Sequence, residues 1–240
     1  MIRRYLCATF TLLGFIPAMV LAEDEASIAS IRAQLVQQGA LAEDINPNRV
    51  TLRSDFKGDD DALALIAQLP DVETLFISEA KISGQGLKHL EKLKNLKTLS
   101  ISHTGMKAEA VAHLAKLPIV TLSLHGVPLR HEQFEVLTKL MSLKSLSVSG
   151  PSIDDAAIEP LLEGGNLSRL QLLGTSLTDS SIAHLKSFAE LEYLSVEESS
   201  RVSPAALTKL WNDLPKLRIV GPTGGIPASK GQPLGFSGED

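Results

Sequence analysis

The sequence has almost no cysteine and few aromatic residues. Cys7 is the only cysteine among 240 residues, and Phe, Trp and Tyr together make up 4% of the chain. A lone cysteine cannot form an internal disulfide, and after Cys7 the chain holds no thiolate metal ligand and no cysteine nucleophile. A core must therefore be built from aliphatic side chains, which an apolar content of 44% supplies.

Long apolar runs are missing after residue 22. The leading segment starts with Arg3 and Arg4, continues as an apolar run and ends at the small-residue sequence Val20-Leu21-Ala22. This pattern is typical of a secretory signal peptide, and an uncleaved N-terminal anchor is the alternative. We therefore expect an exported protein of the periplasm, cell envelope or secreted space, with no membrane span after cleavage.

Basic residues are also fewer than acidic residues. The chain carries 23 Lys and Arg against 28 Asp and Glu, for a net charge of -5, so we expect no nucleic-acid partner. It has no phosphate loop, no H-E-x-x-H zinc motif, no nucleophile elbow and no dinucleotide fingerprint. We therefore expect a chain that is not an enzyme and binds no cofactor.

A repeat of about 24 residues organises most of the chain. In residues 167–190, LSRLQLLGTSLTDSSIAHLKSFAE, leucines alternate as in a short strand, and Thr178-Asp179 then opens a segment with helical apolar spacing. The units begin at Val72, Leu96, Ile119, Leu143, Leu167 and Leu191, and a last half-unit begins at Leu217. This period predicts a solenoid in which each unit supplies one strand and one helix.

Three sets of apolar positions recur in every unit beside the strand leucines. One set follows the turn after the strand: Ile82, Met106, Leu129, Ile153, Leu177 and Val202. Two sets lie one helical turn apart: Leu87, Val111, Phe134, Ile158, Ile182 and Leu207, then Leu90, Leu114, Leu137, Leu161, Leu185 and Leu210. Stacked units would bury all three sets in one core, between a concave parallel sheet and convex helices.

The flanking segments differ in composition from the repeats. We expect a signal peptide at 1–22, a capping helix and turn at 23–48, a repeat domain at 49–220, and a disordered Gly/Pro-rich tail at 221–240. Residues 27–38 have amphipathic helical spacing and end before Gly39, as in a helix that covers the first unit. A partner-binding helix is the alternative for that segment.

Two units depart from the repeat. Pro160 falls inside the helix of the fourth unit, and Gly164-Gly165 replace its last apolar residue, which predicts a short or kinked helix. The sixth unit has two extra residues around 197–201, which predicts a bulged loop on one rim.

The units resemble the pattern L-x-x-L-x-L-x-x-T-x-[IL]-T-D-x-x-[IL]-x-x-L-x-x-[LF] of bacterial leucine-rich repeat proteins of the short, ribonuclease-inhibitor-like type. LKTLSISHTGMKAEAVAHLAKLP (96–118) and residues 167–190 carry the resemblance best. It implies an α/β leucine-rich repeat solenoid and a non-catalytic protein-binding role, through the concave face or its rim. A cell-envelope structural or adhesion protein that recognises cell-wall polysaccharide is the alternative, and we expect a monomer.

The outward strand positions line the concave face, and most of them are serine or threonine. The middle row reads Ser100, Ser123, Ser147, Gln171 and Ser195. Short side chains suit a crowded parallel sheet, and they also suit a hydrogen-bonding surface for a partner. The larger side chains are the candidates for partner binding: Phe76 at one end, and Arg169, Gln171, Tyr193, Glu197 and Glu198 at the other.

The histidines and the acidic loop offer weaker candidates. His89, His113 and His184 recur at one helix position, as solvated convex residues. His103 and His125 fall on adjacent strand ends, too few for a zinc site, and His131 starts a helix. Asp55, Asp59, Asp60 and Asp61 lack the spacing of a calcium loop, so helix capping is the better interpretation and no metal is expected.

Overall fold

Eight parallel strands form a single sheet whose order follows the chain from β1 to β8. A computed structural model describes residues 18–41, 47–163, 166–214 and 216–222. The strands are β1 (Arg49–Leu52), β2 (Thr74–Ser78), β3 (Thr98–Ser102), β4 (Thr121–His125), β5 (Ser145–Ser149), β6 (Arg169–Leu173), β7 (Tyr193–Ser195) and β8 (Arg218–Val220). The strand of each unit therefore pairs with the strand of the next, as the period predicts.

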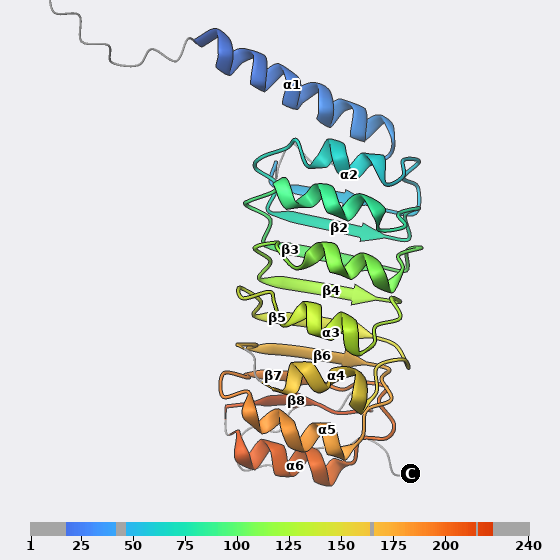
Figure 1. Cartoon of the computed structure of the whole chain (residues 1–240), viewed down its shortest axis with the longest axis vertical. Helices are drawn as coiled ribbons and strands as arrows, with labels where there is room; N and C mark the ends of the chain where they lie inside the picture. Colours follow the sequence, from blue (N-terminus) through green and yellow to red (C-terminus); the bar gives the residue numbers. More distant parts are fainter. Residues whose placement is uncertain (1–17, 42–46, 164–165, 215, 223–240) are drawn as a thin grey trace, which may run out of the picture.

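Short helices form the second layer. After α1 (Ala18–Gln37) they are α2 (Asp61–Ile66), the 3-10 helix η1 (Gln85–Lys92), the 3-10 helix η2 (Ala108–Leu114), α3 (His131–Leu137), α4 (Asp155–Leu162), α5 (Asp179–His184) with η3 (Leu185–Ser187), and α6 (Pro204–Asp213). Figure 1 shows them stacked on one side of the sheet along the long axis. The sequence predicted helices here but did not distinguish the 3-10 helices η1, η2 and η3 from α-helices.

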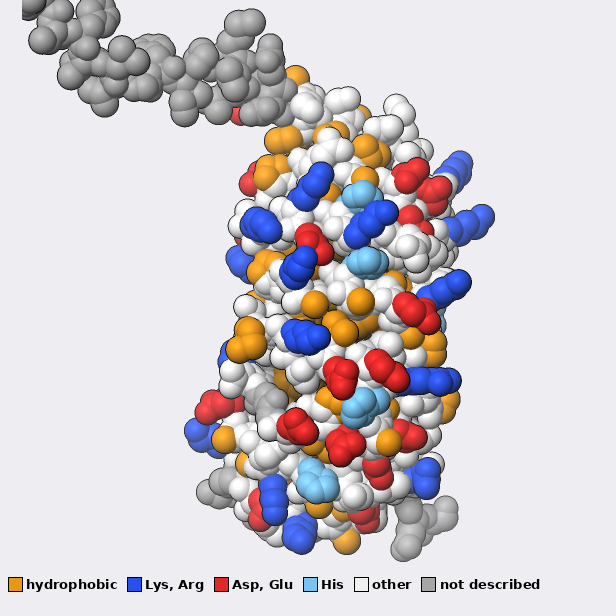
Figure 2. All heavy atoms as spheres, in the orientation of Figure 1, with side chains coloured by type: hydrophobic (Ala, Val, Ile, Leu, Met, Phe, Trp, Pro, Cys, Tyr) orange, Lys and Arg blue, Asp and Glu red, His pale blue; other side chains and the backbone are white. Residues whose placement is uncertain are grey.

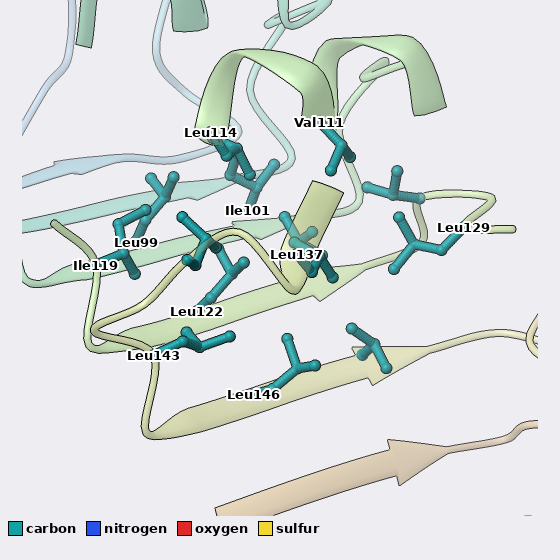
Figure 3. Close-up of a cluster of buried hydrophobic side chains, with 14 of the residues drawn as sticks. Leu99, Ile101, Val111, Leu114, Ile119, Leu122, Leu129, Leu137, Leu143 and Leu146 are labelled. Carbon is teal, nitrogen blue, oxygen red and sulfur yellow. The ribbon is translucent and has the colours of Figure 1, made fainter. Parts of the chain in front are cut away.

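One aliphatic core runs between the two layers. All three recurrent apolar sets are buried, from Leu87 and Val111 to Leu207 and Leu210. In Figure 3, Leu99, Leu122 and Leu146 project from neighbouring strands into one cluster with Val111 and Leu114 of η2 and Leu137 of α3. Burial alternates along β2, β3 and β4, so the outward positions face away from the core, as predicted.

Carboxylates at the starts of α2, α4 and α5 accept hydrogen bonds from the following unit. The Asp155 carboxylate accepts hydrogen bonds from the Thr178 backbone N–H at 2.9 Å and from the hydroxyls of Thr178 and Ser181, both at 2.5 Å. The Asp60 carboxylate accepts hydrogen bonds from the Ser83 hydroxyl and from the backbone N–H groups of Ser83, Gly84 and Gly86. These carboxylates were predicted to cap their own helices. In the structure Asp60 makes no cap hydrogen bond and Asp154 caps α4, so Asp60 and Asp155 bond the next unit instead.

A residue with positive φ directly follows each strand from β2 to β6, and one more lies three residues after the end of β7. These residues are Glu79, His103, Gly126, Gly150, Gly174 and Glu198. Glycine adopts this conformation freely, whereas the other three residues occupy it at a cost of about 1 kcal/mol. The row forms the rim of the concave face at the carboxyl ends of the strands.

The first helix is longer than the sequence predicted. It begins at Ala18 rather than at residue 27, because residues 18–26 are good helix formers, and it runs through the expected cleavage position. Ile31 and Leu35 join the buried core, and Gly39 follows the helix with φ +93°. Residues 1–17 of the expected signal peptide and 223–240 of the expected tail lie outside the described residues.

The fourth-unit helix is not shorter than most of the other helices, so the predicted shortening is wrong and the predicted kink stays a prediction. Helix α4 has 8 residues, more than α2, α3 or α5. Pro160 removes the N–H that would bond the Ala156 carbonyl, but the His131 ring takes that place with Nδ1 3.1 Å from the carbonyl oxygen. Gly164 and Gly165 lie outside the described residues.

The long loop of the sixth unit packs inward. Ser199 is fully buried, its hydroxyl donates to the Leu172 carbonyl at 3.1 Å, and its Oγ lies 2.9 Å from the Thr175 hydroxyl. The extra residues therefore fill the coil and bond the preceding unit rather than only bulging from the rim.

Candidate functional site

The concave face is built from three rows of outward side chains. Strand pairing aligns Phe76, Ser100, Ser123, Ser147, Gln171 and Ser195 in the middle row. The first row, at the amino ends of the strands, runs from Arg49 through Thr74, Thr98, Thr121 and Ser145 to Arg169, Tyr193 and Arg218. The side chains at the centre of this row are small and uncharged, and those at its two ends are large.

Four of the predicted partner-binding residues lie together over β6 and β7. The Arg169 guanidinium carbon is 4.3 Å from the centre of the Tyr193 ring, a stacked cation–π contact. Gln171 and Glu197 occupy the next rows, and the Glu197 carboxylate accepts a hydrogen bond from Ser195 at 2.9 Å. The stack holds the exposed guanidinium in a defined position, as a preformed binding group would require.

Glu198 and Phe76 lie apart from this group. Glu198 lies on the rim three residues after β7 with φ +60°, and its N–H donates to the Pro222 carbonyl at 2.9 Å. Phe76 lies on β2, at the opposite end of the sheet. There the Arg49 guanidinium carbon lies 5.5 Å from its ring centre, so Phe76 forms a second, separate Arg–aromatic pair.

Arg218 is a site residue that the sequence analysis missed. Arg218 lies on β8, is exposed, and pairs with Tyr193 on the strand edge opposite the one that pairs with Arg169. The repeat pattern already marked Arg218, because the last half-unit begins at Leu217 and its first outward position is the next residue. Extending the outward rows into that half-unit would have found it.

The middle of the concave face holds a serine–histidine contact. The Ser147 Oγ lies 3.1 Å from Nε2 of His125, and the His103 N–H donates to the His125 carbonyl, so the two histidines are neighbours as predicted. Burial, and then the charge of His103, lower the pKa of His125. Ser147 is itself buried, and within the described ranges no carboxylate bonds the His125 ring, so the usual features of an activated serine are missing.

The convex face carries an acidic cluster around His131. Figure 2 shows acidic side chains gathered around a histidine over this part of the helix layer. The Ala156 carbonyl is the largest influence that raises the pKa of His131, and Glu135, Glu159 and Glu132 add to it. Groups of three or more side chains able to hold a metal ion do not occur within residues 18–41, 47–163, 166–214 and 216–222.

The substitution Pro160→Ala should lower the pKa of His131. Alanine restores an N–H that can bond the Ala156 carbonyl within α4, and this competes with the imidazole of His131 for the same acceptor. An NMR titration of the ring protons in wild type and variant measures the shift. Because Glu135 and Glu159 remain, the pKa should stay above its ordinary value. An unchanged pKa would show that the carbonyl does not control His131.

Comparisons with known proteins identify the fold. No family model matches the chain, and no curated protein matches it. A chain of the Rad7 and Elc1 complex from yeast is similar at 18% identity and a TM-score of 0.60, over 84% of this chain and 69% of that chain. Internalin C2 from Listeria monocytogenes is similar at 16% identity and a TM-score of 0.51, over 81% of each chain. The predicted α/β leucine-rich repeat solenoid is thus confirmed.

Among the helices of the described residues, α1 included, none is both long and apolar enough to cross a bilayer.

Proposed function

We propose that this chain is a non-catalytic protein-binding module that binds its partner through the concave face over β6, β7 and β8. The observation that carries the proposal is the Arg169–Tyr193 stack on a sheet face of otherwise small polar side chains. Arginine and tyrosine are the side chains that most often dominate the energy of protein interfaces. The leucine-rich repeat neighbours support a protein-interaction role at the level of the fold.

The sequence supports an exported protein of a particular repeat type. The charged start and apolar run of residues 1–22 support export to the periplasm, cell envelope or secreted space. The repeat pattern, with threonine and aspartate at the helix start, supports the short, ribonuclease-inhibitor-like type of bacterial protein. We propose that the exported chain acts as a monomer and binds no cofactor and no nucleic acid.

Partner capture with a charge-reversed variant tests the site. The variant carries Arg169→Glu and Tyr193→Ala, and the matched control carries Lys186→Glu on the exposed part of η3. Proteins are cross-linked to each form in an extract of the source cells and identified by mass spectrometry. We expect the partner recovered with wild type to be recovered with the control and lost with the double variant.

Retention of that partner by the double variant would place the binding surface elsewhere. Binding of wild type to cell-wall glycan oligomers, without any protein partner, would instead favour the polysaccharide-binding alternative. Circular dichroism of the double variant should match wild type, because Arg169 is exposed and Tyr193 only half-buried.

A further inference from the structure

Both ends of the concave face carry an arginine stacked on an aromatic ring. Arg49 on β1 lies over Phe76 on β2, and Arg169 on β6 lies over Tyr193 on β7. These two are the cation–π pairs found among the described residues, and both are on this face. The structure thus holds two similar anchor points, with Arg218 beside the second.

Among the residues that the structure describes, the guanidinium groups at both anchors form no ion pair with a carboxylate. Within the described ranges, the ion pairs are Lys97 with Glu73, Lys116 with Glu91, and His131 with Glu135. Arg49, Arg169 and Arg218 are all exposed on the concave face. An arginine fork binds a carboxylate through two parallel hydrogen bonds, so each anchor can accept an acidic side chain.

The spacing of the anchors suits an extended chain. Arg49 and Arg169 are separated by five strand steps, from β1 to β6. At about 4.8 Å a step this is roughly 24 Å, which an extended peptide spans with about seven residues. The first-row side chains between them are Thr74, Thr98, Thr121 and Ser145. They are short enough to leave room for a backbone, and their hydroxyls can bond it.

Acidic residues border the opposite rim at both anchors. Glu79 follows β2, and Glu197 and Glu198 follow β7, so the strands that carry Phe76 and Tyr193 end in negative charge. An acidic ligand would be attracted to the first row and repelled from the rim. Each aromatic ring also has one face covered by a guanidinium, which leaves less open ring surface for stacking on a sugar.

We propose that the concave face binds an extended acidic peptide segment along its first row. One carboxylate lies at Arg49 over Phe76, and an acidic pair lies between Arg169 and Arg218 around Tyr193. This inference rests on the proposed function, because it names the chemistry of the partner at the same face. The partner is a protein with an exposed, acidic, extended segment.

Fluorescence anisotropy with synthetic peptides tests this directly. The probe is a labelled peptide of alternating glutamate and serine long enough to span both anchors, and its matched control has glutamine in place of glutamate. A short acidic peptide that reaches only one anchor is the third probe. The protein forms are wild type, Arg49→Gln, Arg169→Gln and the convex control Lys186→Gln.

We expect the long acidic peptide to bind wild type and Lys186→Gln equally. Its affinity should fall about tenfold in Arg49→Gln and about tenfold in Arg169→Gln, each compared with wild type. Added salt should weaken it, and the glutamine peptide should not bind. The short peptide should lose affinity in only one of the two variants.

Equal binding of the glutamate and glutamine peptides would overturn the inference, as would equal loss in Lys186→Gln. Displacement of the peptide by an acidic polysaccharide such as polygalacturonate, at a comparable concentration of carboxylates, would also overturn it. If no acidic peptide binds while the charge-reversed variant still loses its cross-linked protein partner, acidic recognition is wrong and the proposed function stands.

Discussion

Replacing Phe134 by alanine should lower the free energy of unfolding by about 3–5 kcal/mol. Phe134 is completely buried in α3 and is one of the two largest fully buried side chains. It occupies a helix position where other units have leucine, isoleucine or valine, so its removal leaves a cavity in the centre of the array. Because each unit contacts only its neighbours, the loss should also uncouple the two halves of the solenoid.

Urea unfolding followed by circular dichroism measures this effect. A broadened or two-step transition in Phe134→Ala would report the uncoupling. The control is Met141→Ala nearby, whose side chain is 80% exposed and whose loss should change stability by less than about 0.5 kcal/mol. A similar, small change in both variants would mean that the units do not share one core.

Replacing Asp155 by alanine should lower the free energy of unfolding by about 2–3 kcal/mol. The carboxylate accepts from the Thr178 N–H and from the hydroxyls of Thr178 and Ser181, and Ser181 is almost fully buried. The substitution therefore leaves a buried hydroxyl without its acceptor. The matched control is Asp154→Ala, which removes one capping bond from the Ala157 N–H and should cost about 1 kcal/mol.

The difference between wild type and Asp155→Ala should depend on pH. Burial raises the pKa of Asp155, but the hydrogen bonds from Ser181 and Thr178 outweigh it, so the folded-state pKa is lowered. A lowered pKa stabilises the folded state above the ordinary carboxyl pKa, and the contribution is lost as the pH falls through the folded value. Thermal melts from pH 7 toward pH 3 should therefore bring the two proteins together. A constant gap would contradict this role.

The sequence predicted the rows of the solenoid because a constant period makes every unit repeat the same side-chain directions. Leu87, Leu114 and Leu210 are all buried at their predicted positions. The outward positions of β2 to β7 also follow from the alternation of a strand, so Arg169 and Tyr193 could be placed side by side before the structure was known.

Contacts between units were harder to predict, since they depend on how neighbouring helices are offset. The bond between His131 and the carbonyl that Pro160 leaves free joins residues 25 apart, and no local pattern marks it. The bonds from Asp155 to Thr178 and Ser181 similarly cross to the next unit. The stack of Arg49 on Phe76 was missed because β1 belongs to an irregular first unit.

Hydroxyl-radical footprinting of the complex tests the central claim, that the partner lies on the concave face. The chain provides its own probes: Phe76 and Tyr193 lie on that face, whereas Met141 and Trp211 lie outside the strands, Met141 in a loop and Trp211 on α6. The account predicts that a bound partner slows oxidation of Tyr193 and Phe76 and leaves Met141 and Trp211 unchanged. Protection of Met141 or Trp211, with Tyr193 still oxidised at its free rate, would contradict it.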